Sequence, residues 1–237
     1  MSACKTVLTL WTPLLLLITA SCVGAPEVRS IYEDVRTSVR LQEDREAGAG
    51  HSHPTRLSPL EVAKLLGGVR VVDERYALHE LIAGSAPAEA AFNLEEIRAL
   101  APAISKALSI ARPNELVTFY RRYTSEAVAL AYTSGGLFAR DGHLYVVLAN
   151  YRQPPSDVMR RGIPDYERDP IDDPLLSLLR GQFSIFFSPQ EAEVHLAKND
   201  WTWFYPEPGK VIVIDTVLAT HTSREAQSEP SASHQQK

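Results

Sequence analysis

Arginine side chains recur near the ends of the strands that the sequence predicts. They are Arg121, Arg122, Arg140, Arg152, Arg160 and Arg161. A guanidinium group binds carboxylates and phosphates through paired, charge-assisted hydrogen bonds. If the folded sheet gathers these residues, the chain can hold an anionic ligand. The alternative, which the sequence alone favours, is a scatter of ordinary surface arginines.

A second group of reactive side chains is acidic and lies between Pro164 and Pro174. It consists of Asp165, Glu167, Asp169, Asp172 and Asp173. Carboxylate oxygens suit Ca²⁺, but the spacing and the glycine of an EF-hand loop are absent. Nearby arginines, namely Arg160, Arg161, Arg168 and Arg180, can neutralise these acids. We therefore expect a solvated acidic loop.

Three large aromatic residues, Trp201, Trp203 and Tyr205, alternate along one predicted strand. Side chains at every second position of a strand point to the same face. Such a face either belongs to the core or forms an exposed surface that docks a glycan, a lipid or a protein. We favour the core and keep the three residues as the candidate partner-binding site.

The sequence contains no complete catalytic motif. His79 lacks the second histidine that a zinc-binding helix places four residues later. Ser134 precedes two glycines but is not flanked by them, as a nucleophile elbow requires. His51 and His53 offer only two metal ligands, in a glycine-rich stretch that we interpret as a flexible linker. We assign no catalytic residue, no metal ligand and no cofactor, and lean towards a non-enzymatic protein.

Cys22 follows a short apolar segment near the N-terminus. Lys5 precedes this segment, which spans residues 6–18, and Thr19-Ala20-Ser21 leads into the cysteine. The segment is too short to cross a bilayer comfortably, so a cleaved signal is favoured over a transmembrane helix. The junction resembles the lipobox of bacterial lipoproteins, in which the cysteine is lipidated and becomes the new N-terminus.

This resemblance covers residues 1–22 alone. It implies a diacylglycerol on the Cys22 thiol and an acyl group such as palmitate on its amine. Two or three acyl chains anchor a protein stably, whereas one chain binds marginally. In this class an aspartate directly after the cysteine tends to retain the protein at the inner membrane. Val23 stands there instead, which implies the periplasmic face of the outer membrane in a Gram-negative host.

The overall composition is that of an ordinary globular protein, with 45% hydrophobic and 22% charged residues. The formal net charge is -5 at pH 7. This mildly acidic balance argues against nucleic acid as a partner, because phosphates favour a basic surface. Cys4 lies in the signal and Cys22 would carry the lipid, so we expect no disulfide in the folded part.

Changes of composition along the chain predict four segments. Residues 1–21 are the cleaved signal. Residues 22–56 are the lipidated cysteine and a tether, with a thin helical stripe over 28–45 and then a flexible linker. Residues 57–218 are one folded domain, and residues 219–237, rich in Ser, Thr and Gln, are a disordered tail.

Local signals place the elements of this domain. Ser58 and Asn93 each precede a glutamate by three residues, which predicts a capped helix start. Pro102 interrupts the second pattern, so we expect two short helices or one kinked helix across 94–111. From residue 115 onwards alternating apolar residues predict strands, with a hairpin at Asp141-Gly142 and a last strand over 211–218.

This order of elements indicates an α+β fold. We expect the N-terminal helices to pack on one face of a mostly antiparallel sheet of about five to six strands. Helices that come before a run of adjacent strands are typical of this class, because hairpins connect antiparallel neighbours without crossover helices.

The function that these observations favour is that of a lipid-anchored envelope protein facing the periplasm. It would be a non-enzymatic binding or scaffold module, with the membrane and an envelope protein or cell-wall component as partners. The alternatives are a lipid-anchored envelope hydrolase and an accessory subunit of an export or cell-wall assembly machine. A deep pocket that joins His79, His143 or His195 with carboxylates would favour the hydrolase.

We predict that Cys22→Ser abolishes lipid labelling and leaves unprocessed precursor, because serine has no thiol to accept the diacylglycerol. Metabolic labelling with a radioactive fatty acid and membrane fractionation measure both effects. Cys4→Ser is the matched control and should label and fractionate like the wild type. A wild-type protein that is processed normally but is soluble and unlabelled would contradict the prediction.

Overall fold

The computed structural model describes seven stretches of the chain. They are residues 27–44, 50–73, 88–124, 130–154, 171–176, 183–195 and 207–220. The expected lipidation site at Cys22 and the aromatic residues Trp201, Trp203 and Tyr205 lie outside the described residues. So do His79 and the expected tail from residue 221 onwards.

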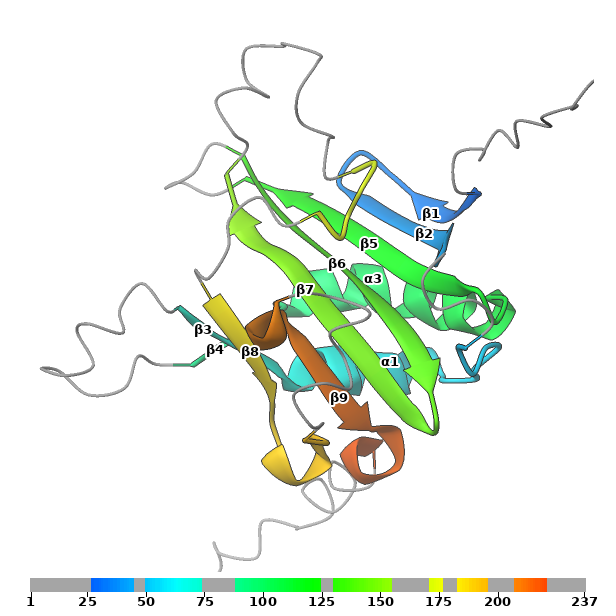
Figure 1. Ribbon diagram of the computed structural model, residues 1–237. Coiled ribbons are helices and arrows are strands. Elements are labelled where there is room, and N and C mark those ends of the chain that lie inside the picture. The colour runs from blue at the N-terminus through cyan, green and yellow to red at the C-terminus, as the bar shows by residue number, and fades with distance from the viewer. Residues whose placement is uncertain are drawn as a thin grey trace, which may run out of the picture.

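The main element is a six-stranded sheet in the order β1-β2-β5-β6-β7-β9 (Figure 1). Its strands are β1 (Val28–Glu33), β2 (Thr37–Glu43), β5 (Glu115–Tyr123), β6 (Ala131–Arg140), β7 (His143–Gln153) and β9 (Val211–Asp215). Every neighbouring pair is antiparallel. A smaller antiparallel sheet consists of β4 (Glu89–Ala90), β3 (Val69–Asp73) and β8 (Phe183–Phe187).

Two helices begin at the predicted capping signals. They are α1 (Pro59–Gly68) and α3 (Leu94–Ile110). The Ser58 hydroxyl accepts a hydrogen bond from the Glu61 amide at 3.3 Å, and the Asn93 side chain accepts one from the Glu96 amide at 2.9 Å. Each glutamate carboxylate accepts in turn from the backbone N–H of its cap residue. Both predicted capping boxes are confirmed.

Pro102 lies inside α3 without ending it, so the region 94–111 contains one helix and not two. A proline removes the N–H that would bind the carbonyl four residues earlier, here that of Arg98. Pro102 is exposed, and water can therefore satisfy the freed carbonyl. The buried face of the helix, with Leu100 and Ile104, is not interrupted.

The predicted hairpin is also confirmed. Asp141 and Gly142 adopt positive φ angles of 50° and 81° and connect β6 to β7, as a two-residue turn between antiparallel strands requires. The last strand is shorter than expected, because β9 ends at Asp215 and residues 216–220 form a helical turn. The Asp215 carboxylate accepts hydrogen bonds from the Val217 and Leu218 amides and thereby starts this turn.

The expected tether over residues 22–56 is wrong for the part that is described. Residues 28–43 form the hairpin β1-β2 and not a solvated helix, and β2 pairs with β5 over seven residues. Val39 and Leu41 of β2 are fully buried. The sequence Thr-Ser-Val-Arg-Leu-Gln has the period of two that suits a strand with one buried face, and this period overrides the weak helical stripe.

Asp34 fixes the turn between β1 and β2. One oxygen of its carboxylate accepts hydrogen bonds from the amides of Arg36 and Thr37, at 2.6 and 2.7 Å. The Asp34 amide also donates to the Thr37 carbonyl at 2.8 Å. An aspartate that binds the backbone two and three residues ahead is a strong turn signal, and it leaves Val35 88% exposed at the tip.

The expected flexible linker is folded in as well. His51 and His53 are only 4% and 5% exposed, and the His51 ring packs against Phe138 at a tilt of 38°, with centroids 4.3 Å apart. His51 Nε2 lies 3.0 Å from the carboxylate of Asp44, which is itself buried. Both ring nitrogens of His53 are buried without a hydrogen-bond partner. This segment therefore belongs to the core of the domain.

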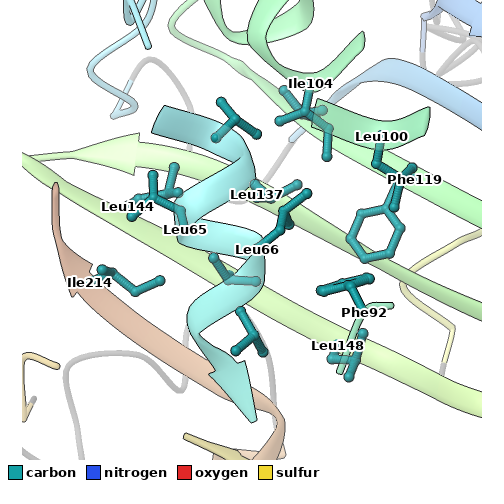
Figure 2. Packing of buried hydrophobic residues seen from close by; sticks show 14 of the residues in the cluster. Leu65, Leu66, Phe92, Leu100, Ile104, Phe119, Leu137, Leu144, Leu148 and Ile214 are labelled. Atoms are coloured by element: carbon teal, nitrogen blue, oxygen red, sulfur yellow. The ribbon is translucent and has the colours of Figure 1, made fainter. Parts of the chain in front are cut away.

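Apolar side chains from the helices and the main sheet form one buried cluster (Figure 2). Its labelled members are Leu65, Leu66, Phe92, Leu100, Ile104, Phe119, Leu137, Leu144, Leu148 and Ile214. Gly135 makes room for the Phe119 ring, because a Cβ there would lie 3.0 Å from it and 2.1 Å from the Val147 carbonyl oxygen. The absence of a side chain thus permits the close packing of β6 against its neighbours.

The α+β class and the mostly antiparallel sheet are confirmed. The order of elements differs from the expectation, because a β-hairpin precedes the helices and a second, three-stranded sheet is present. Within the described stretches, no helix has the length and hydropathy needed to cross a membrane.

We predict that a chain lacking residues 1–56 loses its cooperative thermal transition. The deletion removes β1 and β2, including the fully buried Val39 and Leu41, and each such side chain contributes about 1.5–3 kcal/mol. Circular dichroism melting tests this, with a chain lacking only residues 1–26 as the control. If the chain lacking residues 1–56 melted at the same temperature as the control, the hairpin would be dispensable.

We also predict that folding stability depends on pH through His53. Burial lowers the pKa of His53 from 6.5 to about 4. Between these two pH values the unfolded chain binds more protons than the folded chain. The contribution of neutral His53 to the free energy of unfolding is therefore complete above pH 6.5. It is lost as the pH falls to 4 and amounts to about 3 kcal/mol.

Urea unfolding between pH 4 and 7 tests this pH dependence. The proteins compared are the wild type, His53→Leu and the control His195→Gln, which changes an exposed histidine. His53→Leu should flatten the pH dependence, because leucine cannot be protonated, and the control should keep the wild-type slope. An unchanged slope in His53→Leu would assign the pH dependence to other groups.

Candidate functional site

A cavity of about 380 Å³ lies at one end of the main sheet, where β5 and β7 finish, β6 begins and α3 starts. Its charged and aromatic lining comes from the β1-β2 turn, β5, β7 and the first turn of α3. These residues are Arg36, Arg121, Arg152, Glu95, Glu96 and Tyr123. We call this cavity the arginine pocket.

Strand register explains how residues distant in sequence meet here. Arg121 of β5 faces Thr37 of β2 on one side and Thr133 of β6 on the other. Tyr123 is two positions further along β5, so its side chain points to the same face as that of Arg121. This is the face from which Phe119 enters the apolar cluster with α3. The polar end of that face is the arginine pocket.

Arg121 is the most buried arginine of the pocket, with 6% of its surface exposed. One Nη donates to the Thr37 hydroxyl and the other donates to Glu95 Oε1 at 2.8 Å. The Glu95 side chain is 73% exposed, so this ion pair runs from the interior to the rim. The Arg121 Nε is buried without a hydrogen-bond partner.

Arg152 and Tyr123 form the β5-β7 side of the pocket. Arg152 has a positive φ of 43° at the end of β7, and its amide donates to the Thr133 hydroxyl at 3.2 Å. Its guanidinium lies 5.1 Å from the centre of the Tyr151 ring and 3.5 Å from Glu89, and its side chain stays 42% exposed. The Tyr123 hydroxyl is buried, and burial raises the pKa of this group although the neighbouring Thr133 hydroxyl lowers it.

The N-terminus of α3 supplies two carboxylates with different roles. Glu96 is 4% exposed and accepts from the Asn93 amide at 2.7 Å, as the second half of the capping box. Burial raises its pKa, and the hydrogen bond from Asn93 opposes this shift. Glu95 points outward to the rim. Glu96 therefore maintains the helix start, and Glu95 is the acid that faces solvent.

The pocket combines three guanidinium groups with two carboxylates. Arg36 is exposed and forms no ion pair with any residue in the described parts of the chain. Exposed guanidinium groups bind carboxylates and phosphates through charge-assisted hydrogen bonds. Arg36 and Arg152 can therefore contact an anion directly, while Arg121 adds a buried positive charge beneath them.

The sequence interpretation of scattered arginines is wrong for two residues, since the sheet brings Arg121 and Arg152 into one pocket. Arg140 lies at the opposite end of β6, next to the Asp141 turn. Arg122 points to the other face of β5, and Arg160 and Arg161 lie outside the described residues. Arg36 had not been singled out, because it lies in the segment expected to be a tether.

The other sequence candidates do not form a site in the described residues. Asp172 is exposed and lies 3.9 Å from the partly buried Arg40. Across the described stretches no group of three metal-binding side chains comes together. His143 and His195 do not line the arginine pocket. The Asp44–His51 pair has the form of a catalytic dyad, but the His51 side chain is fully buried, so no substrate reaches it.

No family model, no curated protein and no solved structure matches this chain. The arginine pocket and the N-terminal sequence therefore carry the functional argument.

Proposed function

We propose that this chain is a lipid-anchored protein of the cell envelope that binds a small anionic ligand in the arginine pocket. The observation that carries the binding function is the convergence of Arg36, Arg121 and Arg152 from three separate strands or turns. The cavity volume of about 380 Å³ lies within the range of small-molecule sites, about 300–1,000 Å³. A carboxylate or a phosphate is the chemical group that three arginines favour.

The position of the pocket supports ligand binding. We infer that α1 and α3 cover one face of the six-stranded sheet, so that the cavity lies where this covered face ends. Residues at strand ends and helix starts are held by the rigid elements behind them, while their side chains remain accessible. Arg121 illustrates this, since Thr37 and Glu95 fix its guanidinium from two different elements.

Binding is proposed in preference to catalysis because each acid of the pocket already has a structural partner. Glu96 is held in the capping box and Glu95 in the ion pair with Arg121. Neither carboxylate is placed as a general base next to a nucleophile.

The envelope location rests on the resemblance of Thr19-Ala20-Ser21-Cys22 to a lipobox. A cysteine with two or three acyl chains would hold the domain at the membrane. Anchoring and ligand binding are separable, so a chain without the first 26 residues should still bind. In this proposal the domain captures its anionic ligand in the periplasm and presents it at the membrane surface.

We predict that replacing both Arg36 and Arg152 by Gln weakens anion binding by about 10- to 100-fold, because a hydrogen bond to a charged group contributes about 1.5–3 kcal/mol. Isothermal titration with inorganic phosphate, succinate and citrate measures the affinities. Arg98→Gln is the matched control, since Arg98 is an exposed arginine on α3 outside the pocket. Equal weakening in the control, or no binding of any anion to the wild type, would contradict the proposal.

A further inference from the structure

The exposed charges of the arginine pocket are of both signs. Arg36 and Arg152 are exposed cations, of which Arg152 lies 3.5 Å from Glu89, a residue outside the pocket lining, and Glu95 is an exposed acid in the first turn of α3. The remaining charged groups, Arg121 and Glu96, are buried and engaged with protein partners. A ligand therefore meets two guanidinium groups and one carboxylate.

Arg121 holds Glu95 in place without consuming its capacity to accept. Only Oε1 of Glu95 accepts from Arg121, at 2.8 Å, and Oε2 has no partner among the described residues. A carboxylate has about four lone-pair sites, so one bound guanidinium leaves room for further donors. Glu95 is thus an oriented acceptor for a cationic group at the rim of the pocket.

A ligand with negative charge alone fits this arrangement poorly. A phosphate or a simple dicarboxylate placed between Arg36 and Arg152 would be repelled by Glu95 at short range. A ligand that also carries an ammonium group converts this repulsion into a second ion pair. Two carboxylates and one ammonium match the two exposed arginines and the one exposed glutamate.

The volume of the pocket indicates how much of a ligand it can enclose. A volume of about 380 Å³ corresponds to that of about a dozen water molecules. This space accommodates a single amino acid with its hydration, whereas a folded peptide or a nucleotide with several phosphates would extend outside.

We propose that the arginine pocket binds a free α-amino acid with an acidic side chain. Its two carboxylates contact Arg36 and Arg152, and its ammonium group contacts Glu95. This inference rests on the proposed function and specifies the ligand class. Glu95 is the specificity-determining residue, because it distinguishes the amino acid from the corresponding dicarboxylate.

Titration calorimetry of the mature chain tests the proposal. The ligands are L-glutamate, L-aspartate, glutarate and N-acetyl-L-glutamate. We expect an amino acid to bind at least about 10-fold more tightly than glutarate or N-acetyl-L-glutamate, because only the amino acid forms the ammonium–carboxylate pair. In Glu95→Gln this ratio should fall to about one, while glutarate binding is kept or strengthened. Thermal melting confirms that the variant is folded.

The outcomes separate this inference from the proposed function. The amino-acid inference would be overturned if glutarate or N-acetyl-L-glutamate bound as tightly as the amino acids. It would also be overturned if the ratio of these affinities were unchanged in Glu95→Gln. Either result would leave an anion pocket in place. Binding of inorganic phosphate in preference to all four probes would do the same. Binding of no anion at all would overturn both.

Discussion

The burial of the Arg121 guanidinium between β2, β5 and α3 is the interaction on which the pocket depends. A buried charge is destabilising unless neighbouring groups replace its lost hydration. The Thr37 hydroxyl and the Glu95 carboxylate do so from two different elements. Arg121 therefore requires that β2 pairs with β5 in the observed register, which places Thr37 opposite it, and that α3 begins where it does.

The opposite end of the same strand pair carries a second charged junction. Glu115, the first residue of β5, is 2% exposed and binds the Arg29 guanidinium of β1 through both carboxylate oxygens. The Arg112 amide also donates to this carboxylate, at 2.7 Å. Burial raises the pKa of Glu115, but the bonds from Arg29 and Arg112 outweigh it and lower the pKa overall. The N-terminal hairpin is thus fixed to the domain at both ends of β5.

Local signals in the sequence predicted the elements that depend on local chemistry. Ser58 and Asn93 mark helix starts because a capping box uses only residues within one turn, and Asp141-Gly142 marks a hairpin because few residues tolerate positive φ. The hairpin β1-β2 was missed because its strand character comes from pairing with β5, about 80 residues away. A short amphipathic segment cannot reveal such a partner.

The sequence likewise revealed individual residues of the site but not their convergence. Arg121 and Arg152 were visible as arginines at strand ends, but whether they meet depends on the order of strands in the sheet. Arg36 could be recognised only after the hairpin was known. Glu95 was not singled out, because it stands in the first turn of α3, where the helix dipole favours an acid at any helix start. Its ion pair with Arg121 gives it a second role.

The arginine pocket differs from a packing defect in the chemistry of its walls. An empty space left by imperfect packing is lined by apolar atoms, whereas this cavity exposes arginines and covers a Tyr123 hydroxyl and an Arg121 Nε that lack partners. Each unpaired buried polar group costs about 1–3 kcal/mol. These two groups lie beneath the surface of the pocket, so this part of the domain gives up folding stability to hold its charged residues in place.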